Sequence, residues 1–520
     1  MNDRRCSSQR RQFGWIITRL GLALLALVPV AHAAEWPHYR GPQRDGVSAD
    51  PIQSTFPPEG PPLNWKVPMG AGFSSLTVSG GRAFTQVRRT VDGHDKEVCL
   101  ALSAATGTEL WATPVGDASY PDGGVGDNDG PRSTPSVEGG AVYVLTSHLK
   151  LLKLNATNGS VIWRKDVPEL YGGEMIAWQN AASPLLDGGL IFLNCNNTDS
   201  ADSSFLALRQ ADGGLVWRRG AEGLTHATPT VATIQGVRQV IFFTQSGLVA
   251  VASATGNELW RYGFQFSSSS AASPVVEGDI VYCSAAYGIG AGAVQITKTG
   301  SQFTATELWR NRQFMNEFST PVVFEGHIYG LFGRSWQGSA PLKCIELATG
   351  TELWSQPGFG PGGVLLVDGK LLVNDDRGGI VLVETYTRAY NELARFQAVE
   401  GRSWNSAAIC HSRLYFRSCT EGACYDISLP APPAPLRLIG GLMPPNGQFQ
   451  MLIGAADGSP ANPARLAEVE VLASEQLEMP MFLWSSVVGA LVGDTNGVLY
   501  LEDQDSVLFP SRFYLLRDKQ

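Results

Sequence analysis

The sequence predicts an all-β fold: an eight-bladed β-propeller followed by a small C-terminal β-sandwich module. Three observations predict it. A segment that ends in tryptophan recurs along the chain, 58 of the 520 residues are glycine, and a proline-rich stretch at 429–435 precedes a shorter region of different composition. Many glycines indicate many tight turns, and many turns indicate many short strands. The hydrophobic content of 44% and charged content of 17% are typical of a folded protein.

The first 33 residues have the pattern of a signal peptide. Five arginines precede an apolar run at 20–30, and the small-residue sequence Ala-His-Ala follows at 31–33. The apolar run is too short for a helix that spans a bilayer core of about 30 Å. We therefore expect cleavage after Ala33, a periplasmic or secreted mature protein, and no membrane span after cleavage.

The mature chain is predicted to be acidic. Removal of residues 1–33 takes away five arginines and one aspartate, so the net charge of −9 becomes about −13. An acidic protein without basic runs is a poor ligand for nucleic acid or for anionic lipid. We expect neither as a partner.

Seven of the eight cysteines remain after cleavage. An odd number in an oxidising compartment leaves at least one thiol unpaired within the chain. Cys195, Cys283 and Cys344 fall in apolar strand patterns, where a buried free thiol is expected. Cys419 and Cys424 flank a predicted hairpin turn at 420–423, and a disulfide between these two cysteines is left open.

Each repeat has the pattern of two β-hairpins. Residues 100–111, 249–260 and 344–354 share an alternating strand, a Thr-Gly pair and a short strand that ends in Glu-Leu-Trp. Glycine adopts positive φ at little cost, so the Thr-Gly pair predicts a tight turn between two strands. A second pair of apolar strands joined by glycines precedes it, as at 133–145. Four strands in each unit predict the blade of a propeller.

Tryptophans mark the ends of these units at intervals of 43–54 residues, a period that suits four-stranded blades. They are Trp65, Trp111, Trp163, Trp217, Trp260, Trp309 and Trp354. Glycine stands four positions before five of them, whereas Ala305 stands before Trp309. A further hairpin at 380–396 has Tyr390 and Ala394 in place of glycine and tryptophan, so seven blades are the alternative to eight.

The two ends of the repeat region complete one another. The last unit, from residue 405 to 427, lacks a tryptophan strand, and the strand pattern at 63–67 contains Trp65 but has no hairpin of its own. Pairing these two segments closes the ring and removes open sheet edges. We therefore expect the propeller to occupy residues 61–430.

The recurring Thr-Gly turn and tryptophan resemble the pyrroloquinoline-quinone (PQQ) repeats of secreted bacterial quinoprotein-like propellers. The resemblance implies that the seven tryptophans pack between neighbouring blades as structural residues. Residues 34–60, which begin with Trp36 and Pro37, are similar to the leader before the first blade of secreted members. Residues 436–520 follow a stiff polyproline-like linker and contain four short strand patterns. They resemble C-terminal β modules of other secreted bacterial proteins.

The sequence lacks residue patterns that quinoprotein enzymes use for catalysis. In those enzymes, the resemblance implies, a quinone stacks on a tryptophan beneath a disulfide of adjacent cysteines, and Ca²⁺ is held by oxygen ligands. This sequence has no adjacent cysteines, and no His-Glu-x-x-His, Cys-x-x-Cys or Gly-x-Ser-x-Gly pattern. We expect no cofactor and no metal, and no catalytic residue is assigned.

The best candidate site follows from topology. In a propeller, the segments before the innermost strands converge at one mouth of the central channel, and polar and aromatic groups that converge on a concavity favour ligand binding. The candidate binding residues on these segments are Arg132, Trp178, Gln179, Asn180, His226, Asn316, Glu317, Trp404 and Asn405. The alternative is that they satisfy backbone groups and cap the blades.

The sequence favours an exported, non-catalytic propeller that binds a protein, peptide or glycan at the channel mouth. Propellers of this family in outer-membrane barrel assembly have the fold without a cofactor. The alternative is a PQQ- and Ca²⁺-dependent oxidoreductase for an alcohol or sugar. In it, Trp178 or Trp404 stacks on the quinone, and Glu317, Asn316 and Asn180 lie near the cation. A third hypothesis, a structural spacer, predicts a channel mouth filled with apolar side chains.

Overall fold

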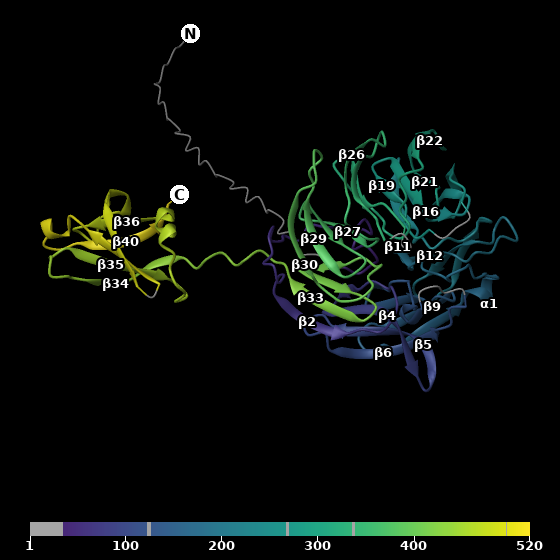
Figure 1. Ribbon diagram of the computed structural model, residues 1–520, viewed down its shortest axis with the longest axis horizontal. Helices are drawn as coiled ribbons and strands as arrows, with labels where there is room; N and C mark the ends of the chain where they lie inside the picture. The colour runs from purple at the N-terminus through teal and green to yellow at the C-terminus, as the bar shows by residue number, and fades with distance from the viewer. Residues whose placement is uncertain (1–34, 122–125, 267–269, 335–337, 496, 520) are drawn as a thin grey trace, which may run out of the picture. The chain divides into compact units, whose positions relative to one another are not determined.

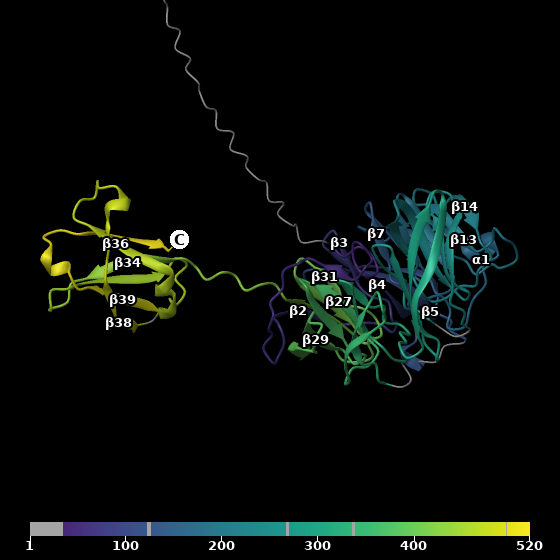
Figure 2. The same cartoon turned by 90° about the horizontal axis from the view of Figure 1, so that it is seen from above.

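Antiparallel strands form most of the chain. The computed structural model describes residues 35–519 except 122–125, 267–269, 335–337 and 496, so the predicted signal peptide lies outside the described residues. The chain divides into two compact units, one that ends at Leu429 and one that begins at Pro430. Both consist of β-sheets (Figures 1 and 2).

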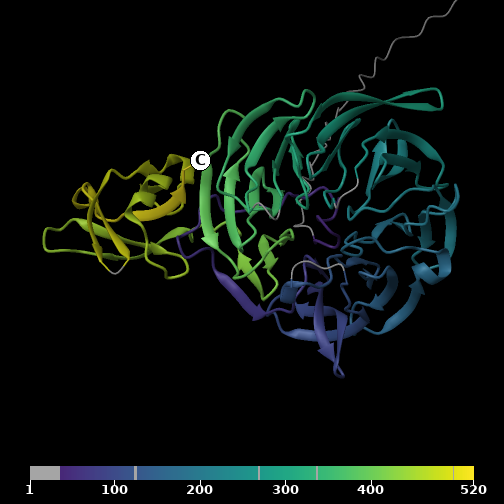
Figure 3. The ribbon, with the colours of Figure 1, turned by 45° about the vertical axis from the view of Figure 1, so that its right-hand side comes forward.

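The first unit contains eight sheets that follow one another around a ring in chain order (Figure 3). The first strands of neighbouring sheets contact each other and surround the centre. Blade 1 contains β3 (Thr77–Ser79), β4 (Arg82–Val91), β5 (His94–Ser103) and β6 (Glu109–Asp117), and blade 2 contains β7 (Ser136–Glu138), β8 (Ala141–Leu145), β9 (Lys150–Asn155) and β10 (Val161–Asp166). Blade 3 contains β11 (Leu185–Asp187), β12 (Leu190–Asn194), β13 (Phe205–Arg209) and β14 (Leu215–Arg219), and blade 4 contains β15 (Thr230–Ile234), β16 (Val237–Thr244), β17 (Gly247–Ala252) and β18 (Glu258–Gly263).

Blades 5–8 continue the ring and confirm the prediction of eight blades. Blade 5 contains β19 (Val275–Glu277), β20 (Ile280–Ala285), β21 (Gly290–Thr299) and β22 (Gln302–Asn311), and blade 6 contains β23 (Val322–Phe324), β24 (His327–Leu331), β25 (Leu342–Glu346) and β26 (Glu352–Gln356). Blade 7 contains β27 (Gly363–Val367), β28 (Lys370–Asn374), β29 (Gly379–Glu384) and β30 (Glu392–Gln397), and blade 8 contains β31 (Ala408–Cys410), β32 (Arg413–Arg417) and β33 (Glu421–Asp426) with β2 (Leu63–Pro68). The degenerate hairpin is therefore a complete blade. A five-residue helix, α1 (Val167–Tyr171), follows β10.

The ring closes as the sequence predicts. Strand β2 pairs antiparallel with β33, and Trp65 lies opposite Cys424. Strands from the two ends of the repeat region thus share blade 8, which leaves no blade with a missing outer strand. The fully buried Arg417 of β32 also ties this blade to the main chain of blade 1.

The tryptophan of one blade packs on the glycine turn of the next. The Trp309 indole NH donates to the Leu347 carbonyl at 2.7 Å, and a Cβ placed on Gly350 would lie 2.5 Å from the Trp309 ring. The same contact joins Trp65 to Gly107, Trp111 to Gly159 and Trp217 to Gly256. Trp260 differs because Ala305 replaces the glycine of the next blade. Its indole NH donates to Gln239 of its own blade at 2.7 Å.

We predict that Gly350→Ala destabilises the propeller more than Gly139→Ala does. Both glycines have positive φ, +72° and +59°, which costs an alanine about 1–2 kcal/mol. Only at Gly350 does the added Cβ also meet the tryptophan, for about a further 1 kcal/mol or more, because nothing lies within 4 Å of a Cβ at Gly139. Urea denaturation of both variants measures the difference. Equal destabilisation would show that the tryptophan contact is loose.

The first part of the leader, residues 35–48, runs inside the ring (purple at the centre of Figure 3), and the rest leads outward to β2. Trp36 pairs with Val78 of β3, the Pro37 carbonyl accepts from Val137 of β7, and β1 (Val47–Ser48) pairs in parallel with β27. The buried Arg40 donates to the Thr320 and Pro321 carbonyls at 2.7 and 2.8 Å, just before β23. The leader thus joins first strands from several blades across the channel.

The second unit is a two-sheet sandwich, as predicted. One sheet has the order β34 (Leu436–Leu442), β35 (Phe449–Ala455), β39 (Val498–Asp503) and β38 (Gly489–Thr495); the other has the order β37 (Ser485–Ser486), β36 (Val469–Ser474) and β40 (Phe513–Asp518). Buried Met451, Ile453 and Leu499 of the first sheet and Val471 of the second form one core. Within the described residues, no helix is long and apolar enough to cross a membrane.

Cys419 and Cys424 do not form a disulfide. All seven described cysteines are free and buried, including Cys195, Cys283 and Cys344 as expected. The hairpin turn lies at 418–421 rather than at 420–423, so Cys424 faces Tyr415 across the strands while Cys419 lies in the turn itself. The Cys419 thiol contacts the Gly72 carbonyl at 3.6 Å, and Cys424 contacts Asn64.

Candidate functional site at the channel mouth

A pocket of about 440 Å³ lies where the segments before the first strands converge. Cavities of this size hold small ligands or parts of larger ones. Its lining residues are Tyr39, Phe73, Ser75, Arg132, Thr134, Trp178, Ala181, Ser183, His226, Thr228, Ala271, Tyr287, Glu317, Phe318, Gly362, Arg402, Trp404, Asn405 and Ser406. We call it the channel-mouth pocket. An open cavity of this size does not match the apolar plug that a structural spacer predicts.

The structure places most of the sequence candidates around this pocket. Those in the lining are Arg132, Trp178, His226, Glu317, Trp404 and Asn405, whereas Gln179, Asn180 and Asn316 are not part of it. These last three side chains are almost fully buried. The structure therefore does not place these three side chains in the pocket.

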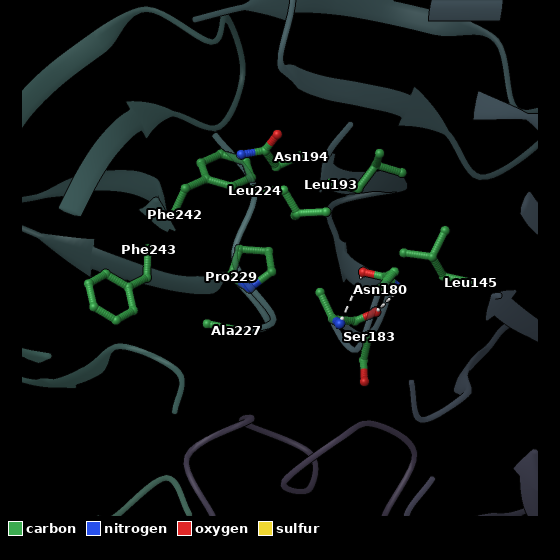
Figure 4. A pocket seen from close by; sticks show the side chains of 11 residues that line it. Leu145, Asn180, Ser183, Leu193, Asn194, Leu224, Ala227, Pro229, Phe242 and Phe243 are labelled. Carbon is green, nitrogen blue, oxygen red and sulfur yellow. Dashed lines mark hydrogen bonds between the residues drawn. The ribbon is translucent and has the colours of Figure 1, made fainter. Parts of the chain in front are cut away.

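Asn180 and Asn316 instead hold the blades together. The Asn180 carboxamide donates to the Ala182 carbonyl at 3.0 Å and accepts from the Ala182 amide at 3.1 Å, beside the small cavity between blades 2 and 4 that Figure 4 shows. The Asn316 side-chain oxygen accepts from the Tyr282 hydroxyl at 2.6 Å, and its nitrogen donates to the Leu331 carbonyl at 2.7 Å. Both side-chain amides thus form hydrogen bonds within the protein, as expected for residues that cap the blades.

One side of the pocket is an aromatic wall formed by Phe73, Phe318 and Trp404. Trp404 stacks on Phe73 at 5.1 Å between ring centroids, and Phe318 lies 5.2 Å from Trp404. Trp404 comes from blade 8 and Phe318 from blade 6. Blade 7, which lies between them in the ring, contributes Gly362 to the pocket lining. The Arg402 guanidinium lies 4.7 Å from the Trp404 ring, a cation–π distance.

The inner edge of the pocket is a hydroxyl belt, formed by Ser75, Thr134, Ser183 and Thr228 of blades 1–4. The Ser75 amide donates to Thr134 Oγ1 at 2.9 Å, the Thr134 amide to Ser183 Oγ at 3.0 Å, and the Ser183 amide to Thr228 Oγ1 at 2.9 Å. The Ser406 amide of blade 8 donates to Ser75 Oγ at 3.2 Å. The belt therefore links consecutive blades and lines the pocket with hydroxyl groups.

Arg132 brings a cation to the pocket. One of its nitrogens, Nη2, donates to the buried Asp129 at 2.6 Å, and the guanidinium lies 5.7 Å from the Tyr120 ring. The Tyr120 hydroxyl donates to Glu97 at 2.8 Å, and burial raises the pKa of that carboxyl group. This network holds the arginine at one edge of the mouth.

Trp178 and His226 occupy the adjoining edge. Trp178 and the following Gln179 both have positive φ, +61° and +54°, and the Trp178 side chain is 39% exposed. Two consecutive non-glycine residues in this region store strain, which is typical of functional sites. Burial lowers the pKa of His226 to about 4, so its imidazole is neutral near pH 7, and Nε2 bonds to the Ala177 carbonyl at 3.0 Å.

Glu317 is paired within the protein. The Tyr287 hydroxyl donates to its carboxylate at 2.8 Å. The two amide oxygens that the oxidoreductase hypothesis places beside it, on Asn316 and Asn180, are occupied as described above. Among the described residues, no group of three or more His, Cys, Asp and Glu side chains is arranged to hold a metal. Two of the three predicted calcium ligands, Asn180 and Asn316, therefore have side-chain oxygens that already accept hydrogen bonds from the protein.

Several lining residues escaped sequence reasoning. Phe73 and Phe318 have the appearance of core residues between strands, and Tyr39 belongs to the leader, which joins the pocket through contacts with residues far along the chain. Arg402 lies two residues before the predicted Trp404. The charge and proximity of Arg402 were the one available signal.

Comparisons with known proteins agree with the fold. The family model for outer membrane protein assembly factor BamB matches residues 94–356, just over half of the chain. A quinohemoprotein alcohol dehydrogenase from Comamonas testosteroni has 13% identity and a TM-score of 0.54, covering 78% of this chain and 82% of its own. BamB from Moraxella catarrhalis has 14% identity and a TM-score of 0.49, covering 69% and 98%. No curated protein matches the chain. At these identities the structural likeness shows the fold alone.

Proposed function

Because this chain belongs to the family of PQQ-repeat β-propellers that the BamB model describes, we propose that it is an exported, non-catalytic binding propeller. Its partner is a protein, peptide or glycan that inserts a group into the channel-mouth pocket. The observation that carries the proposal is the pocket itself: an aromatic wall, two arginines and a hydroxyl belt surround about 440 Å³. Convergent polar groups on an apolar concavity are the usual form of a ligand site.

The strain at Trp178 supports the same function. A packed core has no need for an exposed tryptophan in a left-handed conformation, whereas a binding surface gains a rigid aromatic anchor from it. Export rests on the signal-peptide pattern of residues 1–33.

The oxidoreductase alternative finds less support. Trp404 is already packed against Phe73, Phe318 and Arg402, so its indole is not a free platform for a flat quinone. Two of the three residues predicted to surround a cation, Asn180 and Asn316, use their side-chain oxygens to accept hydrogen bonds from the protein. We derive no catalytic step through a quinone.

Site-specific photo-crosslinking tests the proposal. A photoreactive phenylalanine replaces Trp178 at the pocket, or Tyr386, which is 45% exposed on the hairpin between β29 and β30. In cells that export the protein, we expect covalent adducts from position 178 and none from position 386. Equal capture at both positions, or none at 178, would contradict a partner at the channel mouth.

Calorimetry with PQQ and Ca²⁺ tests the enzyme hypothesis. We expect no calcium-dependent heat of binding, and tight binding of one PQQ per protein would restore that hypothesis.

A further inference from the structure

The floor of the channel-mouth pocket offers more hydrogen-bond donors than the protein uses. Each hydroxyl of the belt accepts one backbone N–H, as given above. Within the described residues, none of these four hydroxyl groups has a protein acceptor for its own proton. Ser75, Thr134, Ser183 and Thr228 all line the pocket, so their O–H groups are available to a bound ligand.

Two nitrogen donors add to this set. Arg132 uses Nη2 on Asp129, but Nη1 is buried without a partner among the described residues. The same holds for the indole NH of Trp404. Buried donors without partners are costly, and a carboxylate satisfies several of them at once through charge-assisted bonds. The donors therefore favour a ligand group that is rich in acceptors and negatively charged.

The pocket also has an acceptor that needs a donor, because the Asn405 side-chain oxygen is buried without a partner among the described residues. The Glu317 carboxylate, which accepts from the Tyr287 hydroxyl, lines the pocket on blade 6. A small anion without a hydroxyl group, such as acetate, does not supply a donor for the Asn405 oxygen. A ligand that carries both a carboxylate and hydroxyl groups does.

The arrangement of these groups favours a sugar ring over a peptide. They come from blades 1, 2, 3, 4, 6 and 8 and surround the channel, so equatorial hydroxyl groups that radiate from a sugar ring can meet them on several sides. An extended peptide crosses the mouth along one line and leaves the other blades without partners. The exposed Trp178 offers an aromatic surface against which the C–H face of a sugar packs.

We propose that the channel-mouth pocket binds a hexuronate residue of an acidic glycan. This inference rests on the proposed binding function and specifies its ligand. The carboxylate lies on Arg132 and the hydroxyl belt, the ring hydroxyls bond to Asn405 and Glu317, and the ring face contacts Trp178.

Calorimetry of the purified mature protein tests this assignment. The probes are tetrasaccharides of galacturonate, mannuronate and glucuronate, each compared with its carboxyl-reduced, neutral counterpart. We expect at least one acidic tetrasaccharide to bind, and its affinity to fall at least tenfold on carboxyl reduction. Arg132→Gln should remove the preference for the acidic form, while Trp178→Ala should weaken both forms. Arg209→Gln, at an exposed ion pair with Asp212, is the matched control and should change neither.

The outcomes separate this inference from the function it rests on. If acidic and neutral sugars bind equally, the carboxylate assignment is wrong while the binding function stands. If none of the sugars binds but a poly-glutamate peptide does, or crosslinking from position 178 captures a protein, the glycan class is wrong and the function again stands. If none of the sugars or peptides binds and position 178 captures nothing, both proposals fall.

Discussion

Replacing Arg417 by alanine is expected to lower the free energy of unfolding of the propeller by about 4 kcal/mol. The guanidinium is fully buried and makes five hydrogen bonds. They reach the Ser418 carbonyl (3.0 Å), Thr85 Oγ1 (3.0 Å), and the carbonyls of Gln86 (2.9 Å), Gly70 (2.6 Å) and Gly72 (3.2 Å). Four of the five acceptors belong to blade 1 or to the segment that leads to it. Alanine would leave these oxygens buried beside an empty space.

The charge of Arg417 persists despite its burial. Burial lowers its pKa to about 10, so the side chain is still protonated near pH 7, and each hydrogen bond is charge-assisted. Arg417→Lys should recover only part of the loss, since one ammonium group has three donors and lacks the planar fork. Urea denaturation followed by tryptophan fluorescence measures both variants. Arg209→Ala, at an exposed ion pair, should cost less than about 0.5 kcal/mol. An equally small effect at Arg417 would show that β2–β33 pairing closes the ring without it.

The sequence predicted local structure well because each blade is formed by a short, continuous segment of the chain. The Thr-Gly turn and the tryptophan lie within about a dozen residues of one another, so turn chemistry and strand alternation suffice to place them. Even the pairing of residues 63–67 with the last unit followed from two incomplete patterns that complemented one another. An irregular unit at Ala305 was visible as a missing glycine, although its consequence for Trp260 was not.

The site was predicted less completely, because it depends on which side chains face the channel. Arg132, Trp178 and Trp404 stand at positions that propeller topology brings together, and chain order alone located them. Asn316 occupies an equivalent position, but its amide is taken up by the Tyr282 hydroxyl, 34 residues earlier in the chain. No periodicity in the sequence reports such a bond. The leader presents the same difficulty on a larger scale, since Arg40 bonds to a carbonyl 280 residues away.

The leader contributes to the lining of the channel-mouth pocket. Tyr39 lines the channel-mouth pocket, while its neighbour Arg40 anchors the same turn to the backbone before β23. A third bond from Arg40 reaches the Asp45 carbonyl at 2.8 Å and folds the leader on itself. We therefore expect ligand binding at the mouth to depend on the docking of the leader.

Arg40→Ala is accordingly expected to release the leader. Loss of the two charge-assisted bonds to the buried Thr320 and Pro321 carbonyls should lower the free energy of leader opening by about 3 kcal/mol. Trypsin cleavage after Arg44 under native conditions should then be about 100-fold faster, since each 1.4 kcal/mol corresponds to a factor of ten. Glu35→Gln is the control, because Glu35 bonds only to exposed groups of the β3–β4 turn, and it should change cleavage less than about threefold. Unchanged cleavage in Arg40→Ala would mean that Trp36 and the β1–β27 pairing suffice to hold the leader. Faster cleavage together with weaker ligand binding would show that Tyr39 belongs to the binding site.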